Sequence, residues 1–193
     1  MPHPTDRFDQ IIAFLQRAQS LKATLRSGAT SAGRRESVAD HSWGLCLLVL
    51  LVEQELDGID LPRLLKLCIL HDLGEAISGD IPAIHQDPTV NKSALERVDF
   101  QTLCAPLPDD LRGQFLTLWD EYEAAETPEA QMAKGLDKLE TMIQHVTGAQ
   151  DSGFDYLWNL GYGTDRTDKA PLLRSLRAKV DAMTQVAGKA QPR

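Results

Sequence analysis

The segment Leu67-Cys68-Ile69-Leu70-His71-Asp72-Leu73-Gly74-Glu75 places a histidine and two carboxylates at the end of an apolar run. Apolar residues in the run 61–73 recur with helical spacing, and His71 falls on their inward stripe. Glu75 comes one turn after His71 and rises on the same face. Unpaired buried polar groups are costly, and a bound cation would compensate them. The segment therefore indicates a metal site, with a structural core histidine as the alternative.

The chain has 193 residues, a length typical of one domain with a sizeable core. It carries 20 basic and 28 acidic residues, so its net charge is −8. Nucleic-acid modules are normally basic, so the acidic balance argues against a nucleic-acid polymer as the partner. A small phosphate ligand held by a local cation is compatible with this balance.

Three cysteines, Cys46, Cys68 and Cys104, lie in apolar contexts without CxxC spacing. Their odd number favours buried free thiols in a reducing cytosol. Residues 1–9 lack a signal-peptide pattern, and the apolar run 45–52 is too short to cross a bilayer. We therefore expect a soluble cytoplasmic protein with no membrane partner.

Apolar residues with a period of 3.6 predict a series of helices, and no segment shows a convincing two-residue period of a strand. The predicted helices span residues 8–27, 37–57, 61–73, 91–105, 108–126, 127–147 and 171–186. Loops are predicted over 27–35 and 78–82, and 151–163 is a glycine- and aromatic-containing connection with room for one short helix. We expect one all-α domain of roughly six to eight helices over residues 1–193.

Four potential metal ligands stand on predicted helices: His41, His71, Asp72 and Asp137. His41 occupies a core position of the helix 37–57, and Asp137 lies at the edge of an apolar helix face. Taken one at a time, each has a structural alternative as a core histidine or a salt-bridged aspartate. Together, two imidazoles and two carboxylates suit one divalent ion of Mn, Co, Fe, Zn or Mg. Water bound to such an ion loses a proton near neutral pH and becomes a nucleophile.

The sequence around these residues contains four recognisable motifs: ESVADHS at 36–42, HDLGE at 71–75, GDIP at 79–82 and LDKLE at 136–140. Their order and spacing resemble the HD-domain superfamily of metal-dependent phosphohydrolases. The match is stronger still to the branch of bacterial 5′-deoxynucleotidases and their eukaryotic HD-domain relatives, and it extends over about 14–140. The resemblance implies a single HD domain, with a metal-site core over about 14–147 and a C-terminal helix over about 171–186.

The resemblance also implies roles for individual residues. The family's metal ligands match His41, His71, Asp72 and Asp137. Glu75 matches a carboxylate that assists proton transfer, and Asp80 matches a second acid beside the attacking water or the leaving oxygen. Arg26 aligns with an arginine that contacts the substrate phosphate. Each has a plainer alternative, which is a surface charge at a helix end for Glu75 and Arg26 and a turn residue for Asp80.

The implied reaction removes the 5′-phosphate from a (deoxy)nucleoside monophosphate by metal-activated water. Arg26, with Lys22 one turn earlier, is the expected protein cation for the phosphate. The chain has Ser27 where bacterial relatives have a tryptophan, so we expect weaker rejection of ribonucleotides. Trp43 lies two residues past His41, and its direction is open. No cluster of aromatic and amide side chains near the motifs predicts recognition of the base, so base identity is expected to matter little.

Three alternatives stay open. The same scaffold could act on another small phosphate ester, or the chain could be a non-catalytic, metal-stabilised binding or regulatory domain. An HD-type oxygenase with two irons would need extra histidines between His71 and Asp137, where the chain has only His85. The resemblance suggests a homodimer. His145, two helical turns beyond Asp137, is expected to be structural.

Overall fold

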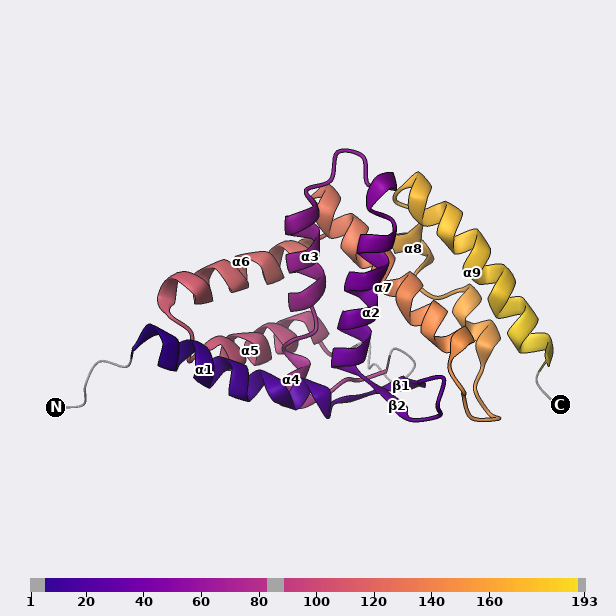
Figure 1. Cartoon of the computed structure of the whole chain (residues 1–193). Coiled ribbons are helices and arrows are strands. Elements are labelled where there is room, and N and C mark those ends of the chain that lie inside the picture. The colour runs from indigo at the N-terminus through magenta and orange to yellow at the C-terminus, as the bar shows by residue number, and fades with distance from the viewer. Residues whose placement is uncertain (1–5, 83–88, 191–193) are drawn as a thin grey trace.

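Figure 1 shows the helical fold in the computed structural model, which describes residues 6–82 and 89–190. Within these ranges seven helices have ten residues or more, and the expected all-α class is confirmed. The long helices are α1 Arg7–Ala18, α2 Val38–Leu51, α3 Leu61–Leu70, α5 Lys92–Cys104, α6 Asp109–Ala124, α7 Pro128–Thr147 and α9 Pro171–Ala190. Shorter helical segments lie between them: η1 Gln19–Lys22, η2 Glu53–Glu55, α4 Glu75–Ser78, η4 Tyr156–Leu160 and α8 Thr164–Thr167.

Helix α7 is the central element and packs against α2, α3, α6 and α9. It begins at a strong cap, where the Thr127 hydroxyl accepts a hydrogen bond from the Ala130 amide and Pro128 occupies the first turn. Its inner side is fully buried at Leu136, Leu139 and Met142. Helix α7 therefore offers a rigid support for polar side chains at the edge of this face.

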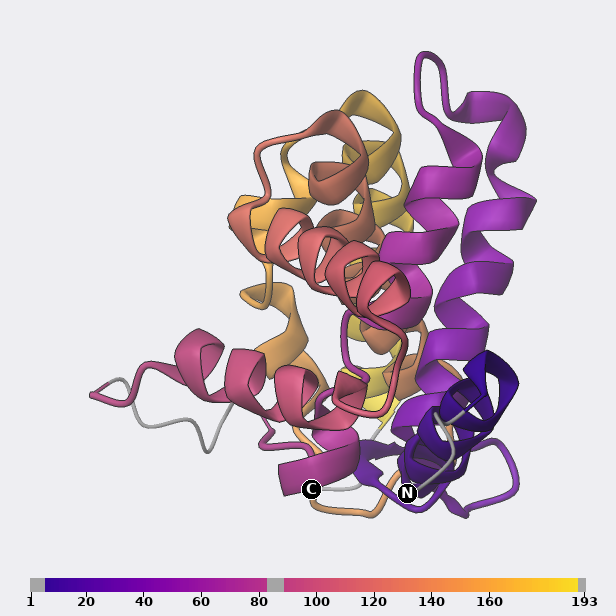
Figure 2. The ribbon, with the colours of Figure 1, turned by 90° about the vertical axis from the view of Figure 1, so that its left-hand side faces the viewer.

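Helices α2 and α3 run side by side and both pack against α7 (Figures 1 and 2). The start of α2 has a capping box, in which Ser37 and Asp40 each satisfy a free backbone amide of the other. At the start of α3 the Asp60 carboxylate accepts a hydrogen bond from the Arg63 amide. These local signals set where the two helices begin and thereby where they deliver the two site histidines.

The region after α1 differs from the prediction of one helix over 8–27. Helix α1 ends at Ala18, and the chain passes through η1 into an antiparallel hairpin. The strands are β1 Leu25–Ala29 and β2 Arg35–Ser37. The expectation of no strand is therefore wrong here, and Arg26 extends from a strand and not from a helix end.

Hydrogen bonds from outside the hairpin explain this difference. The Gln144 side chain of α7 donates to the Ala29 carbonyl at 2.6 Å, and the Ala149 amide donates to the Thr30 carbonyl at 3.0 Å. The turn between the strands contains Gly33 at φ +82°, which a side chain would strain. The spacing of apolar residues in 8–27 carries no information about these partners.

The predicted helix 61–73 also ends early, at Leu70, and His71 and Asp72 lie in the tight turn before α4. The indole nitrogen of Trp119 on α6 donates to the His71 carbonyl at 3.1 Å and holds this turn in place. Helix α9 in contrast continues to Ala190, beyond its predicted end.

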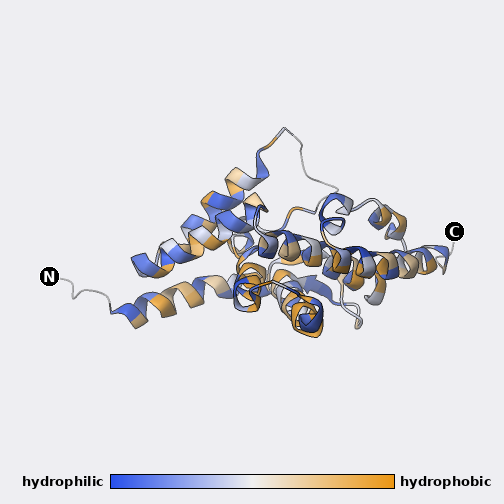
Figure 3. Cartoon of the chain, turned by 90° about the horizontal axis from the view of Figure 1, so that it is seen from above, coloured by the Kyte–Doolittle hydropathy of each residue, from blue (hydrophilic) through white to orange (hydrophobic). Residues whose placement is uncertain are grey.

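Helices α1, α3 and α9 are amphipathic, with apolar residues on one side and polar residues on the other, whereas α2 is apolar on all sides. Figure 3 colours the helices by hydropathy. Close packing between two of them depends on Gly135 of α7, where a Cβ atom would overlap the Leu173 side chain of α9. Cys46, Cys68 and Cys104 are free thiols, as expected. Across the described ranges, no helix combines the length and the apolar character that a membrane span requires.

Candidate active site

His41 and His71 both point their Nε2 atoms into one space between α2, α3 and α7. Nδ1 of His41 is hydrogen-bonded to the Glu140 carboxylate of α7, and Nδ1 of His71 donates to the Cys68 carbonyl at 2.8 Å. Because a carbonyl only accepts, His71 carries a proton on Nδ1, and the neutral ring in this tautomer presents a lone pair at Nε2. The Nε2 atoms of both rings are buried and have no hydrogen-bond partner among the described residues. Metal-binding histidines are commonly oriented in this way.

Two aspartates face these nitrogens. Asp137 Oδ1 lies 3.3 Å from His41 Nε2. Asp72 Oδ2 lies 3.0 Å from His71 Nε2 and 3.9 Å from His41 Nε2. Ligand atoms of His41, His71 and Asp137 all lie within 4.8 Å of one another. The structure therefore brings His41, His71 and Asp137 together from α2, the turn after α3 and α7, and Asp72 borders this cluster beside His71.

This donor set fits a divalent cation. Metal–ligand bonds of about 2.0–2.2 Å place neighbouring donor atoms about 3 Å apart, which is close to the 3.0 Å and 3.3 Å separations found here. In neutral His71 with its proton on Nδ1, the Nε2 lone pair faces a carboxylate oxygen of Asp72 at 3.0 Å, and either a metal ion or a proton on Nε2 relieves the repulsion between them. The residues that the structure describes can thus hold a metal ion.

Side chains around the ligands hold them in these orientations. The second oxygen of Asp137 accepts a hydrogen bond from the Tyr122 hydroxyl at 3.0 Å and lies 2.9 Å from the Lys138 ammonium. The carboxylate of Glu140 can reach His41 because residue 44 is glycine, and a Cβ there would overlap a Glu140 oxygen. Both ligands therefore depend on contacts made by neighbouring helices.

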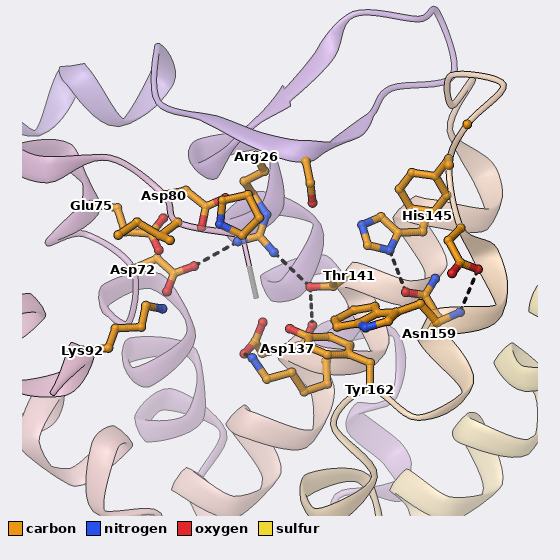
Figure 4. Close-up of a pocket in the computed structure, with 18 residues that line it drawn as sticks. Arg26, Asp72, Glu75, Asp80, Lys92, Asp137, Thr141, His145, Asn159 and Tyr162 are labelled. Atoms are coloured by element: carbon orange, nitrogen blue, oxygen red, sulfur yellow. Dashed lines mark hydrogen bonds and ion pairs between the residues drawn. The ribbon is translucent and has the colours of Figure 1, made fainter. Parts of the chain in front are cut away.

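Arg26 reaches the same site from β1 and its side chain is only 12% exposed, so the surface-cation alternative is wrong. Its guanidinium lies 3.3 Å from Asp72 Oδ2, 3.5 Å from Glu36 Oε2, and donates to the Thr141 hydroxyl at 3.0 Å. Figure 4 draws the contacts with Asp72 and Thr141. Burial and then the charge of Glu140 raise the pKa of Glu36 to about 7, although Arg26 opposes this shift.

Glu75 and Asp80 border the same space (Figure 4). Glu75 is 7% exposed, and its Oε2 atom is buried without a partner in the described part of the chain. Burial, followed by the charges of Asp72 and Asp80, raises the pKa of Glu75 to about 10. Burial likewise raises the pKa of Asp80. A carboxyl group that keeps its proton at neutral pH is suited to donate it.

A pocket of about 390 Å³ opens beside these groups, and in Figure 4 Glu75, Asp80 and Lys92 lie toward one end of it and Tyr162 toward the other. At the polar end Lys92 and Lys138 join Arg26 as cationic lining residues. The other end is lined by Phe154, Trp158 and Tyr162, which we call the aromatic wall. Lys92 and the wall escaped the sequence analysis because they lie outside the four motifs, and Lys138 lies within LDKLE at 136–140 but was not considered as a pocket cation. The aromatic content of the connection 151–163 is a signal that could have pointed to the wall.

The remaining residues singled out from sequence fall in different places. Ser27 lines the pocket, whereas Trp43 is exposed and borders a separate surface hollow. Lys22 is exposed and does not line the pocket, so the structure does not place it as a second phosphate-facing cation. His145 is buried, as expected of a structural histidine, and also lines the pocket. His85 lies outside the described residues.

Comparison with known proteins identifies the family of this chain. The model of the HD domain family matches residues 18–170. The 5′-deoxynucleotidase HDDC2 of Homo sapiens is 31% identical over 136 residues, covering 69% of this chain and 66% of that protein. The 5′-deoxynucleotidase hdd1 of Schizosaccharomyces pombe is 34% identical over 143 residues, covering 69% and 70%. These matches span about two thirds of the length of each relative.

A solved structure is also similar over nearly the whole chain. It is a predicted metal-dependent phosphohydrolase from Magnetospirillum magnetotacticum, with a TM-score of 0.74 and 27% identity, covering 95% of this chain and 96% of that one. The helical fold and the His-Asp cluster define a metal-binding helical protein of the phosphohydrolase type. The chain belongs to the HD domain family.

Proposed function

We propose that this protein is a metal-dependent phosphomonoesterase that removes the 5′-phosphate from (deoxy)nucleoside monophosphates. One observation carries the proposal: the free Nε2 atoms of His41 and His71 meet Asp72 and Asp137 at the polar end of a pocket that also contains Arg26. The relatives named 5′-deoxynucleotidase support the choice of substrate.

In this proposal the four converging side chains hold one divalent ion of Mn, Co, Fe, Zn or Mg. Such an ion supplies a nucleophilic water near neutral pH and positive charge for the phosphate. Glu140 keeps the His41 ring oriented with Nε2 toward the site. Tyr122 and Lys138 hold Asp137 so that its other oxygen faces His41.

Arg26 binds the phosphate oxygens. Its guanidinium is already positioned by Thr141, Asp72 and Glu36, so little freedom is lost when a substrate arrives. Charge spreads over the phosphoryl oxygens in the transition state, and a fixed cation stabilises that charge. Lys92 lines the same end of the pocket and adds a second positive group.

Glu75 donates a proton to the 5′-oxygen as the phosphorus–oxygen bond breaks. Water forms the new bond to phosphorus, and Asp80, which lines the same pocket, orients that water and accepts its proton. The products are inorganic phosphate and a nucleoside. Removal of Glu75 should therefore affect turnover and not metal binding.

A phosphate-release screen over deoxy- and ribonucleoside monophosphates with several divalent metals tests the proposal. Asp72→Ala should lose both metal and activity. Glu75→Gln should keep the metal, and its kcat should fall by about two to four orders of magnitude; the exposed Glu53→Gln is the matched control. Tight nucleotide binding with bound metal, but no release from any phosphate ester, would contradict the proposal and favour a regulatory binding domain.

The same screen measures selection of the sugar. Ser27 leaves open the position at which bacterial relatives have tryptophan, so we expect deoxynucleotides to be the better substrates and ribonucleotides to be slower but measurable. Fitting or rejecting one hydroxyl by shape is worth about 1–3 kcal/mol. A ratio of kcat/KM for dAMP over AMP of about a hundred thousand would show that another residue excludes the 2′-hydroxyl.

We also propose that the protein works in the cytoplasm as a homodimer. Large apolar side chains are exposed along α2 at Trp43, Leu47, Leu50 and Leu51. Exposed apolar patches often mark protein interfaces. Light scattering should find twice the chain mass for the native protein and the chain mass for Leu47→Glu combined with Leu51→Glu. A native protein of single-chain mass would contradict the dimer.

A further inference from the structure

We infer that the aromatic wall of Phe154, Trp158 and Tyr162 is the subsite that stacks on the nucleobase of the substrate. This inference rests on the proposed function. It names the part of the nucleotide that binds next to the aromatic wall. It adds a stacking surface that the sequence analysis missed, and it keeps the expectation that base identity matters little. These three residues lie outside the HD motifs.

A short series of contacts joins the wall to the candidate metal centre. The rings of Trp158 and Tyr162 are stacked, with centroids 5.0 Å apart and an angle of 29° between their planes. The Lys138 ammonium lies 5.3 Å from the Tyr162 ring centre and 2.9 Å from Asp137 Oδ2. In Figure 4 Tyr162 accordingly lies close to Asp137. A ligand whose phosphate contacts the polar end can therefore reach the wall with the rest of its structure.

Within the wall, Trp158 keeps exposed aromatic surface. Trp158 is 40% exposed although it lines a pocket, and Phe154 and Tyr162 are half-buried. Rings of this size usually bury most of their surface, because that burial is their main contribution to stability. Aromatic surface left open inside a pocket is well suited to a flat apolar group of a ligand.

Arg177 of α9 fixes the backbone of the segment that carries Trp158 and Tyr162. Its side chain is buried, and the residue is 7% exposed. Its guanidinium donates to the carbonyls of Asn159, Leu160 and Tyr162 at 3.1, 2.7 and 2.7 Å. The Asp155 carboxylate also accepts hydrogen bonds from the Leu157 and Trp158 amides in the first turn of η4. A wall fixed in this way loses little freedom on binding, which favours affinity.

The chemistry of the two ends identifies the ligand. Cations at the polar end suit a phosphate dianion, and aromatic rings at the other end suit a base, because every nucleobase has a π-face. Stacking is tolerant of base identity, so all four bases should bind, with purines tighter because their rings are larger. A simple sugar phosphate would fill only the polar end.

Trp158→Leu tests the subsite, since leucine keeps apolar bulk but removes the ring system. The measurement is kcat/KM for dAMP and for 2-deoxyribose 5-phosphate, which lacks the base. We expect the ratio of the two values to fall about 10-fold, or about 1.4 kcal/mol, mainly through the KM of dAMP. Trp158→Phe should restore most of it. Leu157→Ala, an exposed neighbour on η4 that does not line the pocket, is the control.

Calorimetry on metal-free protein separates this inference from the proposed function. The native protein should bind dAMP about 10-fold more tightly than 2-deoxyribose 5-phosphate, and Trp158→Leu should bind both alike. Equal affinities in the native protein, or an unchanged ratio in Trp158→Leu, would overturn the stacking subsite. Absence of phosphate release from every substrate would instead overturn the proposed function, and the calorimetric comparison would still decide the subsite.

Discussion

At the scale of single residues, Gly44 links the packing of α2 on α7 to the candidate metal centre. A Cβ at this position would overlap the Glu140 carboxylate, which orients His41. Gly44→Ala should therefore displace Glu140 and lower the affinity for a divalent metal by about 10- to 100-fold, the usual effect of losing a group that orients a ligand. Metal titration by calorimetry measures this change.

The control for this prediction is Gly113→Ala on α6, where a new Cβ would meet no atom within 4 Å. Alanine favours helix over glycine by about 1 kcal/mol, so Gly113→Ala should not unfold more easily than the native protein in the presence of a chelator. Equal metal affinities for the two variants would show that Glu140 does not support the site.

The stability of the protein should depend on pH through the buried side chain of His145. Burial lowers the pKa of His145 to about 4, while its hydrogen bond to Asn159 opposes the shift. A histidine pKa that is lower in the folded than in the unfolded chain leaves stability intact above about pH 6.5. Stability is then lost as the pH falls from there toward 4, because the unfolded state takes up the proton first.

His145→Gln removes this titrating group. Between pH 7.5 and pH 5 the native protein should therefore lose about 2 kcal/mol more unfolding free energy than the variant. Urea unfolding at both pH values with a chelator present measures the difference. The same loss in both proteins would show that His145 titrates normally.

At the scale of elements, α9 supports the pocket through one buried side chain. Arg177→Met would leave the carbonyls of Asn159, Leu160 and Tyr162 without their charged donor. The unfolding free energy should fall by about 3 kcal/mol, since buried groups that lose a charged partner are costly. The KM for nucleotides should rise as the aromatic wall loosens, while metal affinity stays the same.

Arg174→Met is the matched control, because Arg174 lies one turn earlier on α9, is exposed, and donates only to the Asp168 carbonyl among the bonds described. Chemical denaturation and steady-state kinetics of both variants check the prediction. A fall in stability without a change in KM would limit Arg177 to a structural role.

At the scale of the whole molecule, the candidate site joins helices that are far apart in sequence, so metal binding and folding should be linked. Metal at about 100 times its dissociation constant should stabilise the native protein by about 2.7 kcal/mol. Thermal unfolding with and without a chelator measures this as a shift in Tm. Asp72→Ala should show no such shift, and a full shift in that variant would remove Asp72 from the ligand set.

The sequence by itself determined the helical class and the candidate ligands. Apolar periodicity and caps such as Ser37 and Thr127 act within one or two turns, so local spacing is enough to place most helices. His71, Asp72 and Asp137 were candidates because they interrupt apolar faces. Their role as ligands stays a prediction.

Only the tertiary structure decided which groups meet. Arg26 lies on a strand because α7 supplies hydrogen bonds to the hairpin, and Glu140 orients a histidine 99 residues away. The aromatic wall comes from a connection far from the motifs, and Arg177 fixes it from α9. Such contacts join residues that are distant along the chain. They follow from how whole helices pack, and local periodicity does not encode that packing.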